Sequence, residues 1–239
     1  MPTSRPDQRS QDRLVIAVDG PSGSGKSSVS RAVAERLGLR YLDTGAMYRA
    51  LTWWALEQQL DLSDSATEPA VAELARSLPL EIGQTPSSTQ LLVDGQDVSA
   101  AIREPRISGA VSAVATNLAV REELVRRQRE IAAAEGGIVI EGRDITTVVA
   151  PDADVRVLLT ANEQARLARR ALEVHGTDDH HAIERTRDHV VLRDAVDSTV
   201  ATFTEAADGV TVVDSSALSF EETVEAVLAL VHKTAKVSS

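Results

Sequence analysis

The sequence predicts an α/β fold in which helices flank a central parallel sheet. Near the start of the chain, an apolar run that ends at Asp19 leads through a glycine-rich loop into an amphipathic segment, and a second strand and helix follow over 40–60. Later, the runs 138–141 and 155–159 have the composition of buried strands and alternate with helical patterns. Strands that alternate with helices form parallel sheets with right-handed crossovers.

Length, charge and residue content narrow the class of protein. With 239 residues, the chain can form one large domain or a core with an insertion. The formal net charge of -11 argues against a nucleic-acid partner, and the absence of Cys excludes disulfides and cysteine-ligated metals. No apolar run is long enough to span a membrane, and the polar segment 1–13 lacks the apolar core of a secretory signal. We therefore expect a soluble, cytoplasmic monomer with a disordered N-terminal tail, 1–13.

The first elements follow from local patterns. We expect a buried strand over 14–18, then the glycine-rich loop, then a helix with apolar residues at helical spacing that ends near Leu37. Gly38 suits the C-cap of this helix. A second short strand over 40–45 ends in a turn, and a helix over 46–60 follows.

The pattern changes after residue 60. The expected order is a loop over 61–69, a short helix over 70–77, strands over 80–82 and 90–93, and a further extended pair at 97–98. Asp94-Gly95 is a strong signal for a two-residue hairpin turn. A hairpin within an α/β chain predicts an inserted antiparallel subdomain that ends near residue 105.

The remaining chain returns to the alternating pattern. Glycines at 136–137 end the second of two helices, and Asn162 is a suitable N-cap for a later one. The expected elements are helices over 107–115 and 119–135, strands over 138–141 and 155–159, a helix over 162–174, a polar stretch over 175–181, a helix over 182–197, a strand over 210–213 and a closing helix over 220–231.

The glycine-rich loop predicts a phosphate site. Gly20 to Ser27 fits G-x-x-x-x-G-K-[ST], and the strand before it and the helix after it provide the required context. Glycines let successive backbone N–H groups converge on phosphate oxygens, and the helix N-terminus faces the same anion. Lys26 is expected to reach the β- and γ-phosphates, and Ser27 to bind Mg²⁺. The residues expected to bind the triphosphate are Gly20, Pro21, Ser22, Gly23, Ser24, Gly25, Lys26, Ser27 and Ser28.

Two strand ends carry polar residues that suit a second, phosphorylated ligand. Thr44, Tyr48 and Arg49 follow the second strand, and Arg143 follows the run 138–141. Ligands gather beyond the carboxyl ends of parallel strands, and a guanidinium pairs bidentately with phosphate. The alternatives are a helix N-terminus with a surface arginine at the first position, and a local salt bridge between Arg143 and Asp144 at the second.

The remaining charged clusters are interpreted by default as solvated surface residues. Arg193 and Asp197 stand four residues apart on one predicted helix, and exposed pairs of this kind are usually solvated salt bridges. The same default applies to the basic cluster Arg166, Arg169 and Arg170. His180 and His181 are interpreted as loop residues, because no further ligand has useful spacing.

Taken together, these segments resemble the bacterial cytidylate kinase family. The resemblance runs from about Val15 to the closing helix, and the phosphate loop alone would not be specific. The matching segments are 19–27, 42–49 (Leu-Asp-Thr-Gly-Ala-Met-Tyr-Arg), 97–99, 102–103, 120–121, 127–129, 141–144 (Glu-Gly-Arg-Asp), 147–149, 151–153, 193–194 and Asp197.

The resemblance implies a P-loop nucleoside monophosphate (NMP) kinase fold. In this fold, a parallel core sheet flanked by helices carries an inserted NMP-binding subdomain, which contains a small antiparallel sheet, and a helical lid. The implied division is a kinase core over 14–60 and 136–239, including a lid over about 170–200, and an NMP-binding region with the insert over 61–135.

The resemblance also implies a reaction and roles for its residues. ATP would phosphorylate CMP or dCMP with Mg²⁺, as part of pyrimidine nucleotide metabolism. Ser112, Arg121 and Asp144 would contact the cytosine edge, for which they offer suitable donors and acceptors. The other implied roles are acceptor ribose and phosphate binding by Thr44, Tyr48, Arg49 and Arg143, phosphate and sugar contacts from the lid by Arg193 and Asp197, and catalysis by Lys26, Arg143, Arg193 and Asp144.

The chain departs from the family pattern at several positions. Val200 stands where the family often has an arginine, and Leu118, Thr146 and Ala150 stand where it has proline, glycine and phenylalanine. Without an arginine at position 200, three alternatives stay open: neighbouring arginines suffice, another residue such as Arg187 moves in, or turnover is slower. Two other functions stay open: a P-loop kinase for another small acceptor, and a nucleotide-dependent switch.

Overall fold

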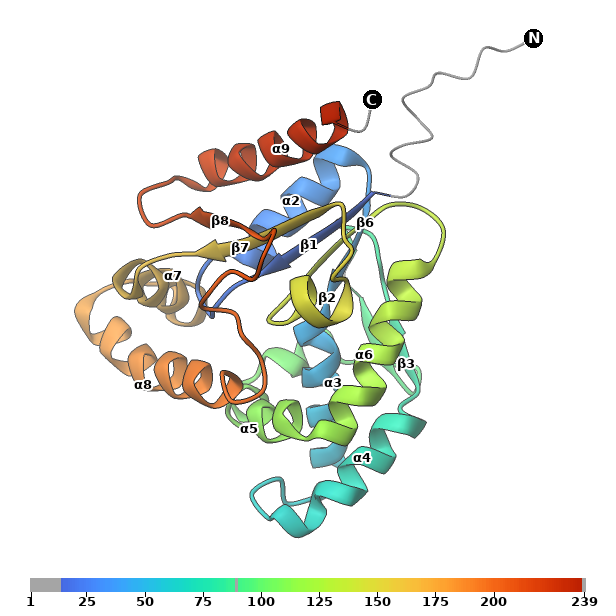
Figure 1. Ribbon diagram of the computed structural model, residues 1–239. Coiled ribbons are helices and arrows are strands. Elements are labelled where there is room, and N and C mark those ends of the chain that lie inside the picture. The colour runs from blue at the N-terminus through green and yellow to red at the C-terminus, as the bar shows by residue number, and fades with distance from the viewer. Residues whose placement is uncertain (1–13, 89, 238–239) are drawn as a thin grey trace.

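A five-stranded parallel sheet forms the centre of the protein, as the sequence predicts (Figure 1). The computed structural model describes residues 14–88 and 90–237, so the predicted tail over 1–13 lies outside the described residues. The strand order is β2-β6-β1-β7-β8. The strands are β1 (Val15–Asp19), β2 (Arg40–Asp43), β6 (Ile138–Gly142), β7 (Val155–Thr160) and β8 (Thr211–Asp214).

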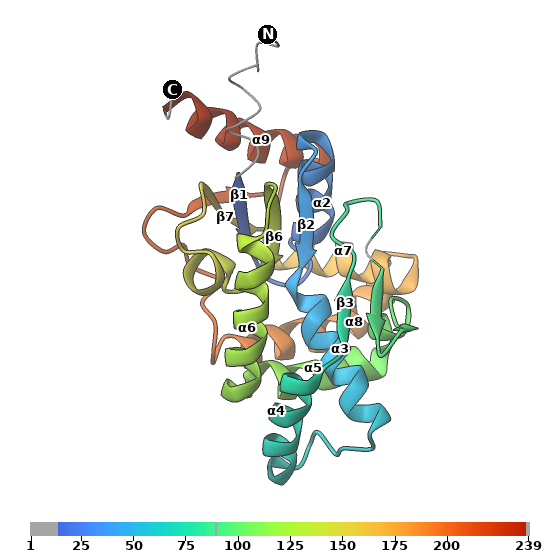
Figure 2. The same ribbon diagram turned by 90° about the vertical axis from the view of Figure 1, so that its right-hand side faces the viewer.

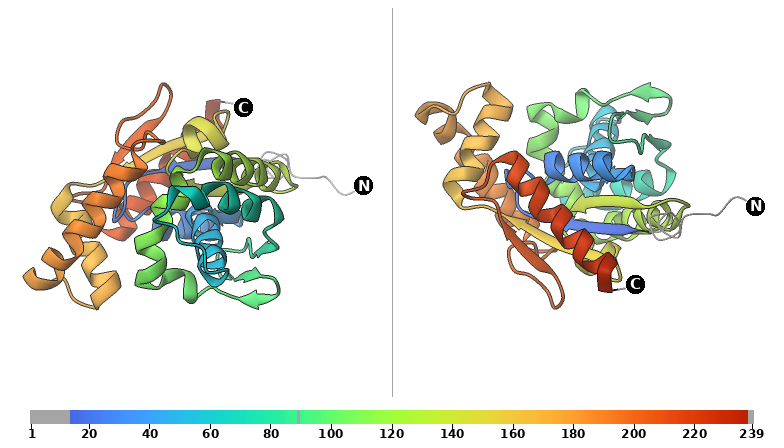
Figure 3. Two further views of the ribbon diagram at one scale, coloured as in Figure 1. Left: turned by 90° about the horizontal axis from the view of Figure 1, so that it is seen from below. Right: turned by 90° about the horizontal axis from the view of Figure 1, so that it is seen from above.

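Helices cover both faces of this sheet (Figures 1 and 3). Helices α2 (Lys26–Leu37) and α9 (Phe220–Val237) lie on one face, and α3 (Thr44–Glu57) and α6 (Leu118–Ala133) lie on the other. The strands alternate accordingly, because Ile16 belongs to the core under α2 and α9 and Ala17 to the core under α3 and α6. Burial on both faces explains why the central strands are mainly apolar.

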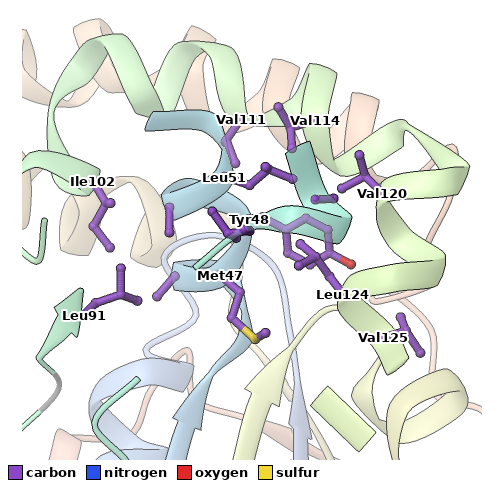
Figure 4. Close-up of a cluster of buried hydrophobic side chains, with 14 of the residues drawn as sticks. Met47, Tyr48, Leu51, Leu91, Ile102, Val111, Val114, Val120, Leu124 and Val125 are labelled. Atoms are coloured by element: carbon purple, nitrogen blue, oxygen red, sulfur yellow. The ribbon is translucent and has the colours of Figure 1, made fainter. Parts of the chain in front are cut away.

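Helix α3 connects the sheet to the other helices of the core that lies under α3 and α6 (Figure 4). Met47, Tyr48 and Leu51 pack there with residues of α5 (Pro105–Thr116) and α6. The Tyr48 ring lies within this apolar cluster, with its hydroxyl directed to the α6 side (Figure 4). One continuous core therefore supports the helices that carry the predicted acceptor residues.

The predicted insert is an antiparallel sheet of order β3-β4-β5 (Figure 2). Asp94 and Gly95 both have positive φ, 50° and 74°, which is the geometry of the predicted hairpin turn. The region predicted as a loop over 61–69 is partly helical, because α4 already begins at Glu68. The elements are η1 (Ser65–Thr67), α4 (Glu68–Ser77), β3 (Leu80–Ile82), β4 (Leu91–Val93), β5 (Gln96–Asp97) and η2 (Ala101–Arg103).

Two helices follow β7 and lie beside the open end of the sheet (Figures 1 and 2). They are α7 (Glu163–His175), which Asn162 caps as predicted by accepting a hydrogen bond from the Ala165 N–H, and α8 (His180–Asp197). The interpretation of His180 and His181 as loop residues is wrong. The Asp179 side chain accepts a hydrogen bond from the Ala182 N–H and caps α8. The helix therefore begins at His180, before the first apolar residue from which the sequence pattern predicted its start.

Two local differences affect the site. Helix α3 begins at Thr44, two residues earlier than expected, because Asp43 accepts a hydrogen bond from the Ala46 N–H and ends β2. A π-helical turn, η3 (Ile145–Val149), follows β6 and was not predicted. The buried Asp19 carboxylate holds this turn by accepting bonds from the Ile145 N–H and from both the N–H and the hydroxyl of Thr146. Within the described residues, no helix is both long and apolar enough to cross a membrane.

Candidate active site

The glycine-rich loop lies between β1 and α2, and close packing fixes its course. A Cβ on Gly20 would lie 2.3 Å from the Leu159 carbonyl oxygen, and one on Gly23 would lie 2.4 Å from that of Arg166. Gly23 and Gly25 also have positive φ, 76° and 90°. Glycine is therefore required at position 23 for both backbone geometry and contact with α7, at position 20 for contact with β7, and at position 25 for backbone geometry.

Arginines of α7 bind the outer carbonyl groups of this loop. Arg166 Nη1 donates to the Ser22 carbonyl at 2.9 Å, and Arg169 Nη1 donates to the Ser24 carbonyl at 3.3 Å. Arg169 also donates to the Ser215 hydroxyl and carbonyl. The default prediction of a solvated basic surface is therefore wrong for these two arginines, because loop carbonyls take their charge-assisted hydrogen bonds. Arg170 alone pairs with an exposed acid, Glu173, at 2.7 Å.

Lys26 begins α2 among acidic groups. Withdrawal from water lowers the pKa of Lys26, and the nearby Glu141 carboxylate opposes this shift. Glu141 is 1% exposed at the end of β6, and its Oε1 accepts a hydrogen bond from the Ser27 hydroxyl at 2.6 Å. Burial and the neighbouring Asp43 raise the pKa of Glu141. The loop thus presents a cation and a hydroxyl directly above a buried carboxylate.

The ends of β2 and β6 meet where the sequence predicts a second, phosphorylated ligand. Asp43, besides capping α3, pairs with Arg49 at 2.8 Å between Oδ2 and Nη2. The buried Thr44 hydroxyl donates to the Glu141 carbonyl at 2.8 Å, which ties the two strand ends together. The Tyr48 ring also lines this side, but burial raises the pKa of its phenol. Its hydroxyl therefore stays protonated in the apolar cluster.

Four predicted residues form two part-buried polar contacts. Arg121 Nη2 on α6 lies 2.5 Å from Asp144 Oδ2, and the side chains are 14% and 8% exposed. The Ser112 hydroxyl on α5 donates to Asp197 Oδ1 at 2.9 Å. Asp197 is on α8, so this bond joins the predicted lid to the helix that carries Ser112.

Arg143 and Arg193 converge on the same place from β6 and α8. The Arg143 guanidinium lies 2.9 Å from both Asp194 and Asp197, and 4.4 Å from the ring centre of the fully buried Phe203. Arg193 lies 3.6 Å from Asp197. Burial and the neighbouring cation Arg143 lower the pKa of Arg193 to about 10, so it remains protonated at neutral pH. The default of a solvated Arg193–Asp197 pair is therefore wrong, because both side chains face an enclosed, cationic site.

A cavity of about 1060 Å³ joins the phosphate loop to these residues. All but three of the predicted site residues line it; the exceptions are Gly20 and Pro21, at the start of the loop, and Ser112, which bonds the lining residue Asp197. Val200 lines the cavity, while Arg187 is half exposed and faces Glu163 and Glu184 at 3.6 and 3.4 Å. The suggestion that Arg187 replaces an arginine at position 200 is thus unsupported by the side-chain placement.

The cavity also has lining residues to which the sequence analysis assigned no site role. Asp43 is the last residue of β2, and Glu141 is the penultimate residue of β6. Acidic side chains so close to the ends of buried strands are unusual, and this placement was visible in the sequence. Arg103 enters from η2, Leu218 from the segment between β8 and α9, and Phe220 from the first position of α9. Periodicity offered no signal for these three, because they come from connecting segments and helix ends.

Comparisons with known proteins agree with this architecture. A family model described as cytidylate kinase matches residues 16–233. The chain is 50% identical over 222 residues to a cytidylate kinase of Cutibacterium acnes, covering 92% of this chain and 97% of that protein. It is 47% identical over 227 residues to a cytidylate kinase of Rhodococcus jostii, covering 94% and 97%. A crystal structure of an uncharacterized protein from Eubacterium ventriosum matches with a TM-score of 0.50 and 12% identity over 92% of this chain and 98% of that chain, which supports the fold alone. With a family match over most of its length and relatives at this level of identity, the chain belongs to the cytidylate kinase family.

Proposed function

We propose that this protein transfers the γ-phosphoryl group of ATP to CMP or dCMP, giving CDP or dCDP for pyrimidine nucleotide metabolism. The observation that carries the proposal is the shared cavity. The phosphate loop, Arg121, Asp144 and several further arginines line the same cavity. A donor and an acceptor can therefore lie in one cavity, as phosphoryl transfer requires.

On the donor side, the loop residues 20–28 bind the triphosphate through backbone N–H groups and the N-terminus of α2. Lys26 places its charge at the β- and γ-phosphoryl oxygens. Arg143 and Arg193 stabilise the charge that develops on the transferring group, because both residues line the cavity that the phosphate loop also lines. The acceptor phosphate is ionised near neutral pH, so the transfer needs no separate general base.

On the acceptor side, Ser112, Arg121 and Asp144 recognise cytosine. A buried carboxylate accepts a hydrogen bond from an amino group, and the serine and the guanidinium donate to ring nitrogen and carbonyl acceptors. Thr44, Tyr48 and Arg49 line the side on which the ribose and phosphate would lie, the tyrosine through its ring. Arg193 and Asp197 contact phosphate and sugar from α8.

A magnesium ion suits the same loop. Mg²⁺ prefers oxygen ligands and is usually held by one or two protein groups together with substrate phosphates. The Ser27 hydroxyl and the Glu141 carboxylate, 2.6 Å apart beneath the loop, offer such oxygens. Ser27 would bind the ion directly, and Glu141 would orient the hydroxyl or a bound water. When bound, Mg²⁺ neutralises charge on the β- and γ-phosphoryl oxygens.

A substrate panel tests the proposal. The purified protein, Mg²⁺ and ATP are incubated with CMP, dCMP, UMP or AMP, and ADP formation is followed by a coupled assay. We expect CMP and dCMP to accelerate ADP formation far more than UMP or AMP. Acceleration by a different acceptor would identify a P-loop kinase of other specificity. If no monophosphate accelerates ATP consumption, the proposed function is wrong. Gel filtration and cell fractionation test the accompanying proposal of a cytoplasmic monomer.

A further inference from the structure

The carboxylate of Asp194, on α8, occupies part of the phosphate loop. Its Oδ1 accepts a hydrogen bond from the Ser22 N–H at 3.3 Å and lies 2.9 Å from Arg143 Nη2. Its Oδ2 lies 2.5 Å from Arg166 Nη1, and the side chain is only 13% exposed. A loop N–H and two guanidinium groups are the donors that a phosphate oxygen uses in such loops. A side chain of the protein itself therefore satisfies donors that an incoming triphosphate would need.

The contacts of Asp194 continue to the acceptor side. Arg143 binds Asp194 through Nη2 and Asp197 through Nη1, each at 2.9 Å. Asp197 in turn accepts the hydrogen bond of the Ser112 hydroxyl. One row of polar contacts thus runs from the phosphate loop, through two residues of α8 and Arg143, to a residue proposed to recognise the acceptor base. The side chains in this row are largely buried, so water screens the interactions between their charges only weakly.

The carboxylates in this row limit how strongly Arg143 can attract an acceptor phosphate. Asp194 and Asp197 also pair with Arg166 and Arg193, but together they occupy both terminal nitrogens of Arg143. Arg143 therefore attracts an acceptor phosphate only weakly in this arrangement. A triphosphate on the loop carries several negative charges. It competes with Asp194 for the Ser22 N–H and Arg166, and it repels the carboxylate. Once Asp194 withdraws, Arg143 faces one carboxylate fewer and attracts the acceptor phosphate more strongly.

We propose that Asp194 is a positioning residue that couples the two substrates, so that donor binding raises the affinity for the acceptor. The inference rests on the proposed function, because it needs a triphosphate on the loop and a phosphorylated acceptor near Arg143. Direct repulsion between the two substrates acts against the coupling. That repulsion is present whichever residue occupies position 194, so comparison of variants isolates the contribution of Asp194.

Calorimetric titration of CMP tests the coupling. CMP is titrated into wild type and Asp194→Asn, each with and without saturating Mg²⁺ and β,γ-methylene-ATP, a non-hydrolysable donor. In wild type, we expect the donor analogue to lower the Kd for CMP at least fivefold, within the range of about 5- to 150-fold typical of coupled sites. In Asp194→Asn, CMP should bind without the analogue nearly as tightly as it binds wild type with it. The analogue should then change the Kd less than twofold.

Asp178→Asn is the matched control. It removes the same charge from an exposed position in the turn before α8, and it should keep the wild-type coupling. A wild type whose CMP affinity is unchanged by the analogue overturns the inference without any variant. The inference is also wrong if Asp194→Asn keeps the wild-type ratio of the two Kd values, which is the result expected of a residue that only braces the arginines. Wild type that fails to bind CMP under either condition instead refutes the proposed function.

Discussion

Replacement of Asp144 by asparagine tests how the acceptor base is recognised. The carboxylate is buried, and its Oδ2 is bound to Arg121. Asparagine has nearly the same shape, but only one of its two terminal atoms accepts hydrogen bonds. If the amide oxygen keeps the bond to Arg121, the amide N–H₂ faces the base. A donor in that position suits the O4 oxygen of uracil and opposes the amino group of cytosine.

The size of the effect follows from the burial of this carboxylate. A hydrogen bond to a charged group contributes about 1.5–3 kcal/mol, and each 1.4 kcal/mol changes an equilibrium or rate about tenfold. We therefore expect kcat/KM with CMP to fall about 10- to 100-fold, while kcat/KM with UMP stays constant or rises. Removing one partner of a buried ion pair costs about 3–5 kcal/mol of stability. That figure is an upper limit for Asp144→Asn, since the amide retains a neutral bond to Arg121.

The assay compares kcat/KM for CMP and UMP at saturating ATP, and a thermal unfolding curve shows whether the variant is folded. Asp152→Asn, at an exposed position a few residues on, serves as the control for loss of one negative charge. Equal losses with CMP and UMP would refute the reasoning, because they would mean that the carboxylate supports the cavity without reading the base.

Two further predictions concern the phosphate loop and the turn behind it. Gly23→Ala should raise the KM for ATP at least tenfold, because the left-handed backbone strains alanine by about 1–2 kcal/mol and the added Cβ meets the Arg166 carbonyl. Gly38 has a similar φ but open space around it, so Gly38→Ala should lower the stability and leave the KM unchanged. Similar KM values for the two variants would contradict this reasoning. Burial raises the pKa of Asp19 from 3.8 to about 6, which means that the folded protein favours the protonated side chain. The stability gained from this preference is fully present below pH 3.8 and is lost as the pH rises through 6. The unfolding free energy of wild type minus that of Asp19→Asn should therefore fall by roughly 3 kcal/mol between acid and neutral pH in denaturant titrations, and a constant difference would exclude the titration of Asp19.

The fold was predictable because its signals are local. The apolar strands, the hairpin at Asp94 and Gly95, and the Asn162 cap each act within a few residues of the chain. The turn η3 was missed for the opposite reason. It is held by Asp19, whose carboxylate reaches across the sheet to backbone groups more than a hundred residues away. A local pattern does not contain that information.

The positions of several candidate residues at the cavity were predictable, while their roles stay predictions. Lys26 and Ser27 were placed by the loop motif, and Arg143 by its position at a strand end. The pairing of these groups was not predictable, because Arg143 meets Asp194 and Asp197 only when α8 packs against α5. The same charges on an isolated helix would be a solvated pair, which is why the default interpretation failed here.

The arginines of α7 follow from the geometry of the phosphate loop itself. A loop that directs successive N–H groups to a phosphate must direct carbonyl groups the other way, and part-buried carbonyls need donors. Arg166 and Arg169 supply them at Ser22 and Ser24, and Gly23 allows the backbone of α7 to approach closely enough. Basic residues that have the pattern of a surface helix thus support the proposed phosphate site by binding the loop carbonyl groups. Because the same Arg166 also binds Asp194, the shape of the loop and the position of α8 depend on each other.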